Sequence, residues 1–175
     1  MSYPSLAQLD FLPYIDPTGA IAPDFEQKIG IYAIFDGTAS LCYVGYSRDC
    51  QKSLQQHLVR RPFLCHWIKL HTCEQPNRSL LEEIKNAWLE EHGEIPAGNN
   101  HEEHLWTEPI DIKKTLTPEQ QAEIDAAEDL QKSKILKDYA RRVENRILER
   151  LAARGLKIDL RFHPKLKEQG LLDLK

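Results

Sequence analysis

The sequence predicts an α/β (α+β) protein with a small antiparallel sheet of three strands, flanked by helices, and a long helix near the C-terminus. Three observations predict this fold. Two short runs of β-favouring residues enclose an Asp-Gly pair, which is typical of a β-hairpin. Two segments with apolar residues at helical spacing flank a third apolar run. A Thr-Pro pair then opens a last amphipathic segment, as at a helix start.

The hairpin strands are expected at Ile29–Phe35 and Leu41–Tyr46, with Asp36-Gly37 in the turn between them. A helix is expected next, over Ser47–Arg61, because Ser47 suits the N-cap position and apolar residues follow at helical spacing. Pro62 ends this helix, since proline cannot donate the backbone hydrogen bond that a helix needs.

Phe63–Cys73 is aromatic and aliphatic and is predicted to be the third strand. A helix starting at Ser79 is expected after it, because Glu82 stands three residues on and completes a capping box. The last helix begins at Thr117 and carries an apolar face to about Arg154. These elements divide the chain into a lead segment that packs on the domain (1–27), the domain itself (28–100), a linker (101–116) and the long helix with its tail (117–175).

The composition is that of a soluble globular protein: 41% of the residues are apolar, 29% are charged and the net charge is −4. The sequence contains no run of 18 apolar residues, so no membrane-spanning helix is expected. The N-terminus lacks the pattern of a secretory signal. The four cysteines form no Cys-x-x-Cys pair and are expected to be reduced thiols. The predicted location is therefore the cytoplasm, or the plastid stroma if the source is a plant, with no membrane partner. The cysteines are Cys42, Cys50, Cys65 and Cys73.

A pair of short motifs lies on the predicted hairpin. Gly30-Ile31-Tyr32 is followed after ten residues by Tyr43-Val44-Gly45. With these motifs in this order on hairpin, helix, strand and helix, the chain resembles the GIY-YIG nuclease family over about residues 28–100. The positions that extend the resemblance are Ser47, Asp49, His57, Pro96 and Asn99. The whole chain also resembles a group of GIY-YIG-domain proteins from cyanobacteria and plastids.

The resemblance implies metal-assisted hydrolysis of a phosphodiester. In that family the first tyrosine orients or deprotonates the attacking water, an arginine neutralises the phosphate and a glutamate holds a divalent metal, usually Mg²⁺. The resemblance thus makes Tyr32, Tyr43 and His57 the candidate catalytic residues. It implies a Mg²⁺ cofactor only if the chain is an active enzyme.

Two positions depart from the family pattern. The arginine position falls on Ser53, which has no charge with which to bind phosphate. The metal-glutamate position falls on Lys85, which repels a divalent cation. Glu82 and Glu83 are the remaining candidate metal ligands on the same helix. These departures predict a degenerate active site with impaired catalysis.

Three functions remain open. The first is a nucleic-acid-binding or scaffold module on a decayed nuclease fold. Its contacts would come from residues 48–71, which contain five basic residues and one acidic residue, Asp49. The second is a divergent Mg²⁺-dependent endonuclease in which Arg48 or Lys52 replaces the missing arginine. The third is a protein-interaction module that uses the long C-terminal helix. The candidate binding residues are Gly30, Gly45, Arg48, Lys52, Arg60, Arg61 and Asn99, and Lys69 completes the basic segment.

Overall fold

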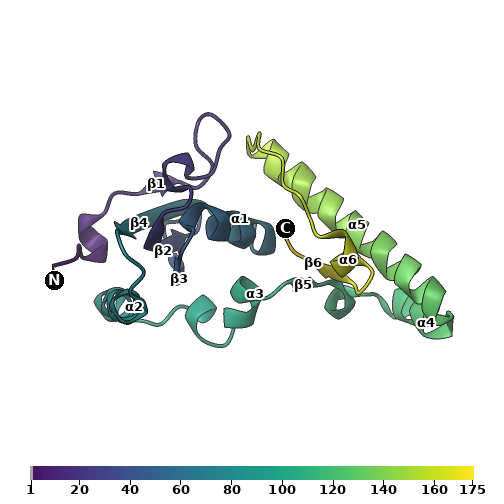
Figure 1. Cartoon of the computed structure of the whole chain (residues 1–175). Coiled ribbons are helices and arrows are strands. Elements are labelled where there is room, and N and C mark those ends of the chain that lie inside the picture. The colour runs from purple at the N-terminus through teal and green to yellow at the C-terminus, as the bar shows by residue number, and fades with distance from the viewer. Residues whose placement is uncertain (1) are drawn as a thin grey trace. The chain divides into compact units, whose positions relative to one another are not determined.

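A computed structural model describes residues 2–175 of the chain. The chain forms two compact units, Met1–Thr107 and Glu108–Lys175. Figure 1 colours the chain from purple at the N-terminus through teal and green to yellow at the C-terminus. The units divide inside the segment 101–116 that was predicted to be a linker, and each is described separately below.

The first unit is built on an antiparallel sheet with strand order β1-β4-β2-β3. The mixed α/β class is confirmed, but the expected number of three strands is wrong. A fourth strand, β1 (Leu12–Pro13), comes from the lead segment and pairs with β4. A segment of two residues is too short to show the alternation that predicts a strand. Strand β1 is defined only by its pairing with β4. The other strands are β2 (Ile29–Phe35), β3 (Leu41–Ser47) and β4 (Trp67–Cys73).

The β2–β3 hairpin is closed by Asp36 rather than by a two-residue Asp-Gly turn. One oxygen of the Asp36 carboxylate accepts hydrogen bonds from the backbone N–H groups of Thr38 and Ser40, at 2.9 and 3.0 Å. Ala39 takes a left-handed backbone conformation within this loop (φ 61°). The resulting register places Tyr32 opposite Gly45.

Two helices cover the sheet, and both begin at a different cap from the one expected. Helix α1 (Cys50–Arg60) is capped by Asp49, whose side chain accepts from the N–H of Lys52. Helix α2 (Arg78–His92) is capped by Asn77 rather than Ser79. The short elements of this unit are η1 (Leu6–Gln8), η2 (Pro23–Phe25), η3 (Ala97–Asn99) and α3 (Glu103–Thr107).

Side chains alternate between the two faces of a strand, so the sheet separates two apolar layers. One layer packs Ile31, Ala33 and Val44 against the α2 residues Ile84 and Trp88. The opposite face carries Tyr32 and Tyr43, which contact His57 of α1. Helices α1 and α2 therefore pack on opposite faces of the sheet. Side chains of α2 that point into the sheet are separated from the tyrosine cluster by the sheet itself.

The lead segment is tied to both layers by hydrogen bonds. The Tyr14 hydroxyl donates to the carbonyl of Leu54 on α1 at 2.6 Å. The Trp88 indole N–H on α2 donates to the carbonyl of Pro4 at 3.1 Å. The Glu91 carboxylate accepts from the N–H groups of Leu6 and Ala7 at the start of η1.

The second unit is mainly helical. The long helix expected from Thr117 to Arg154 is two helices, because the chain leaves the helical conformation at Ala127 and Glu128. Its expected start is observed, since Thr117 and Gln120 form a capping box. The elements are β5 (Ile110–Asp111), η4 (Ile112–Thr115), α4 (Pro118–Ala126), α5 (Asp129–Ala153), α6 (Pro164–Lys167) and β6 (Leu171–Leu172), with β5 and β6 paired. Among residues 2–175, no helix has the length and apolarity needed to cross a membrane.

Candidate functional site

The two motif tyrosines and His57 form one buried cluster on the α1 face of the sheet. The Tyr32 oxygen lies 2.9 Å from Nε2 of His57, and Nδ1 of His57 lies 2.9 Å from the carbonyl oxygen of Trp106. A carbonyl can only accept, so Nδ1 carries the proton and donates to Trp106. In the neutral ring Nε2 is then an acceptor, and the Tyr32 hydroxyl donates to it.

Trp106 of α3 closes this cluster. Its ring stacks on Tyr43 with a centroid distance of 5.0 Å and an interplanar angle of 5°. Its carbonyl accepts a second hydrogen bond from Nη1 of Arg60 at 2.8 Å, and the guanidinium of Arg61 lies 6.0 Å from the indole centroid. Residues 101–116 show little periodicity in the sequence, so this covering residue was not predicted.

Burial keeps all three groups of the cluster neutral. Desolvation raises the pKa of Tyr32 well above its usual value, with further increases from Tyr43 and Cys50, and it raises the pKa of Tyr43 to about 12. Desolvation also lowers the pKa of His57 to about 3, helped by the nearby charge of Arg60. Only 2% of Tyr32 is exposed. The cluster therefore provides neither a phenolate nor an open surface at which water and a phosphodiester could meet.

The position expected to neutralise phosphate carries no charge. The Ser53 hydroxyl donates its single proton to the hydroxyl of Ser47 at 2.7 Å. Arg60, on the same helix, donates to the Trp106 carbonyl, while Lys52 is exposed. The charge nearest in effect to the two tyrosines is that of Arg60, which opposes the rise of their pKa values and is hydrogen-bonded to the Trp106 carbonyl.

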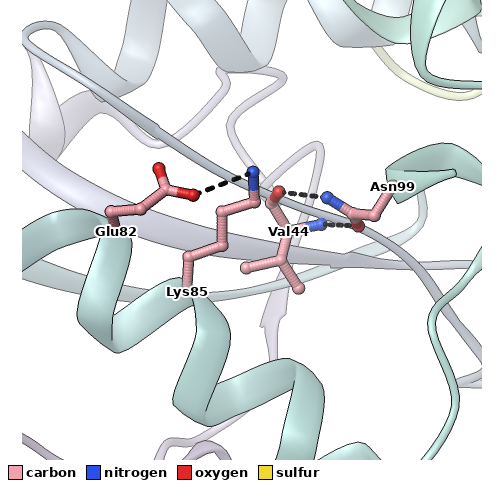
Figure 2. Close-up of polar contacts among 4 residues, drawn as sticks. All are labelled: Val44, Glu82, Lys85 and Asn99. Atoms are coloured by element: carbon pink, nitrogen blue, oxygen red, sulfur yellow. Dashed lines mark hydrogen bonds and ion pairs between the residues drawn. The ribbon is translucent and has the colours of Figure 1, made fainter.

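The candidate metal ligands lie on α2, which packs against the opposite face of the sheet. Glu82 forms an ion pair with Lys85 at 3.9 Å (Figure 2). Glu83 accepts from the Tyr3 hydroxyl at 3.2 Å. No group of three or more His, Cys, Asp or Glu side chains suited to hold a metal occurs within residues 2–175. The expectation of Mg²⁺ held by Glu82 or Glu83 is wrong. Glu82 pairs with Lys85 and Glu83 bonds Tyr3, and both lie on the helix that packs against the sheet face opposite the tyrosines.

Several candidate binding residues have structural contacts. Asn99 completes the edge of β3, accepting from the Val44 N–H and donating to the Val44 carbonyl, both at 2.8 Å (Figure 2). A Cβ on Gly30 would lie 2.5 Å from the His71 carbonyl oxygen, and one on Gly45 would lie 2.6 Å from the Tyr43 ring. Close packing therefore explains why these two motif positions are glycine.

The basic segment 48–71 does not form one surface. Lys69 is buried and donates from Nζ to the carbonyl of Leu6 at 3.0 Å. Arg61 pairs with Glu102 at 3.6 Å, and Arg60 bonds Trp106. Only Arg48 and Lys52 remain exposed. This dispersal removes the continuous patch on which the nucleic-acid prediction depended.

The four cysteines are free thiols. Cys50 and Cys65 are fully buried, and Cys42 is partly exposed with its pKa raised by burial to about 11. Cys73 is also partly exposed, and it lines two surface hollows of about 340 and 470 Å³. The sequence did not distinguish Cys73 from the others, because exposure at the end of β4 depends on the neighbouring segments.

Cys50 and Cys73 cannot form an internal disulfide in this fold. Cys73 packs with the α2 layer, beside its strand partner Ile29. The Cys50 sulfur lies instead on the α1 face, 3.2 Å from where a Cβ on Gly30 would stand. The sheet separates the two sulfurs, whereas disulfide geometry requires adjacent Cβ atoms. All four cysteines are accordingly free thiols in this structure.

No family model matches the chain. A protein of Arabidopsis thaliana named bifunctional monothiol glutaredoxin-S16, chloroplastic, is 30% identical to it over 127 residues. The match covers 69% of this chain and 42% of that relative. The chain thus corresponds to less than half the length of a protein whose name describes two functions.

These findings overturn the assignment to the GIY-YIG nuclease family and the functions that followed from it. The relative is named as a glutaredoxin and not as a nuclease, and no family model supports a nuclease domain. The structure gives a physical reason as well, because the candidate catalytic tyrosines are buried with Trp106 stacked on Tyr43, and no cluster of metal ligands occurs among residues 2–175. The nuclease, nucleic-acid and scaffold predictions are therefore wrong.

Proposed function

We propose that this chain is a redox-linked module that carries one modifiable thiol, Cys73, and does not itself act as a catalytic glutaredoxin. The observation that carries the proposal is the placement of Cys73, a partly exposed thiol that lines two surface hollows. The likeness to a protein named as a monothiol glutaredoxin supports thiol chemistry for the chain.

The proposed step is a thiol–disulfide exchange. The Cys73 thiolate attacks one sulfur of a small disulfide such as glutathione disulfide, and a new S–S bond forms on Cys73. The original S–S bond breaks and one glutathione leaves as a thiolate. The protein thiol is oxidised to the disulfide level, and the departing sulfur is reduced, so the electrons balance.

The surroundings of Cys73 predict slow exchange. Desolvation raises its pKa, and it also lowers the pKa of the neighbouring His71, so that this imidazole is neutral at pH 7. Catalytic thiols instead have lowered pKa values next to cations or helix N-termini. Cys73 therefore fits a thiol that is modified by others, at a rate that rises with pH.

Intact-protein mass spectrometry after incubation with glutathione disulfide tests this proposal. We expect the mass of one glutathione to be added, faster at pH 9 than at pH 7, and reversal by dithiothreitol. The adduct should disappear in Cys73→Ser and persist in the control Cys42→Ser, which alters the other partly exposed thiol. An adduct that survives Cys73→Ser, or no adduct at either pH, would refute the proposal.

A second candidate is favoured by the raised thiol pKa values together with the word bifunctional in the relative's name. In this alternative, the chain corresponds to the part of such a protein that performs the other function, without thiol chemistry. Absence of any glutathione adduct would support it. Under either candidate, a cytoplasmic or plastid location stays a prediction.

A further inference from the structure

A surface hollow of about 310 Å³ lies between the end of β3 and the start of α2. Its apolar lining includes Ile29, Tyr46 and Leu81, and its polar lining includes Arg48 and Arg78. No Asp or Glu lines it. The volume is in the range of small-molecule sites, roughly 300–1,000 Å³, which combine an apolar body with a few polar groups.

The two arginines are unpaired within the part of the chain that the structure describes, residues 2–175. Nearby carboxylates are engaged elsewhere. Asp49 accepts from the N–H of Lys52 at 3.1 Å, and Glu82 pairs with Lys85 at 3.9 Å. Both arginines line a hollow that has no acidic lining residue, so an oxyanion bound there would supply the missing counter-charge.

The start of α2 adds to the same electrostatic preference. The helix has 15 residues and no acidic residue in its first turn. Asn77 uses its side-chain oxygen for the N–H of Leu80 and its carbonyl for the N–H of Leu81. The N–H groups of Arg78 and Ser79 precede these two, and the positive end of the helix dipole lies beside the hollow.

We propose that this hollow binds a small molecule that carries a carboxylate or phosphate on a short apolar or aromatic body. The oxyanion lies between Arg48 and Arg78, and the apolar body packs on Ile29, Leu81 and the ring of Tyr46. The proposal is independent of Cys73, because that residue does not line this hollow.

Three probes that share a benzene ring separate the contributions: phenyl phosphate, benzoate and uncharged benzyl alcohol. They are titrated into the full-length ¹⁵N-labelled chain, and amide shifts are followed by NMR. We expect phenyl phosphate or benzoate to shift resonances of residues 46–48 and 76–81 in a saturable manner. The oxyanion that binds more tightly identifies the class of ligand, and benzyl alcohol should bind at least about tenfold more weakly.

Variants connect binding to the two arginines. The double variant Arg48→Gln/Arg78→Gln should bind the preferred probe at least about tenfold more weakly. The control Arg141→Gln removes an exposed arginine from α5 and should bind like the wild type. Because Arg48 and Arg78 are both exposed, the double variant should keep a dispersed amide spectrum that shows a folded chain.

Three results would overturn the proposal. The first is equal binding of benzyl alcohol, which would indicate an apolar hollow without anion recognition. The second is unchanged binding in the double variant. The third is a pattern of shifts spread over basic residues of both units and weakened equally by Arg141→Gln, which would indicate non-specific attraction of anions.

Discussion

The Tyr32 hydroxyl and the His57 imidazole are joined by a buried hydrogen bond of 2.9 Å. The donor is Tyr32, because the other ring nitrogen of His57 donates to the carbonyl of Trp106. A tyrosine that resembles a catalytic residue in the sequence therefore has a structural role in this molecule. It satisfies the acceptor nitrogen of a histidine that the fold keeps neutral.

Replacing Tyr32 with Phe removes this donor and leaves Nε2 of His57 buried without its partner. We expect the free energy of unfolding to fall by about 1–3 kcal/mol, the usual cost of an unsatisfied buried polar group. Urea denaturation followed by circular dichroism measures the change. Tyr46→Phe is the matched control, because this partly exposed tyrosine belongs to the same sheet. An equal loss in both variants would contradict the assigned role.

The depressed pKa of His57 makes stability depend on pH. The ordinary value is 6.5 and the folded value is about 3, so the unfolded chain binds a proton between these limits that the folded chain does not. Unfolding therefore becomes easier as the pH falls below 6.5, by about 1.4 kcal/mol per pH unit from this one group. The contribution is fully present at pH 7 and is lost progressively as the pH approaches 3.

The variant His57→Gln isolates this effect from the titration of carboxylates. We expect the variant to be less stable than the wild type at pH 7, and the difference between them to shrink as the pH falls toward 4. Denaturant midpoints measured at pH 7, 5.5 and 4 give the comparison. If the difference stayed constant with pH, His57 would not be the responsible group.

Sequence patterns predicted the elements whose conformation is determined by the residues within them. The runs around Asp36, the apolar spacing of α1 and α2, and the Thr117 start of α4 were all readable because their signals are local. Strand β1 was not predictable, since its two residues become a strand only against β4. The break at Ala127 and Glu128 was also missed, because no proline or glycine marks it in the sequence.

The candidate site could be predicted less well than the fold. The sequence placed Tyr32, Tyr43 and His57 near one another, and the structure brings them into contact. It did not reveal that Trp106 covers them, because this contact joins residues far apart in the chain. The motif glycines also suggested a family, although close approach of neighbouring groups at Gly30 and Gly45 accounts for them physically. Short motifs set by packing can therefore resemble catalytic signatures.

Asn99 acts as a substitute for a neighbouring strand at the edge of β3. Its side-chain amide makes both hydrogen bonds that a strand would offer to Val44. Asn99→Ala should lower the free energy of unfolding by about 2–4 kcal/mol, because two backbone groups lose their partners. Asn99→Asp should lose a similar amount, since an ionised carboxylate cannot donate to the Val44 carbonyl. The exposed neighbour provides the control Asn100→Ala, and thermal denaturation measures all three.

Lys69 is a buried lysine whose ammonium group is held by a carbonyl and two aromatic rings. Its Nζ lies 3.0 Å from the Leu6 oxygen, 4.3 Å from the Phe11 centroid and 5.8 Å from the Phe35 centroid. Because both Leu6 and Phe11 belong to the lead segment, Lys69 fastens that segment to β4. A cation–π contact of this kind contributes about 0.5–2 kcal/mol.

A double-mutant cycle with Phe11→Leu and Lys69→Met measures this contribution, because leucine keeps an apolar side chain and methionine keeps the length of the stem. We expect a coupling free energy of about 0.5–2 kcal/mol between the two positions. Hydrogen exchange should also show faster opening of residues 6–13 in each single variant. Additive effects of the two substitutions would mean that the ring contributes only buried area, and that the Leu6 carbonyl alone holds the ammonium group.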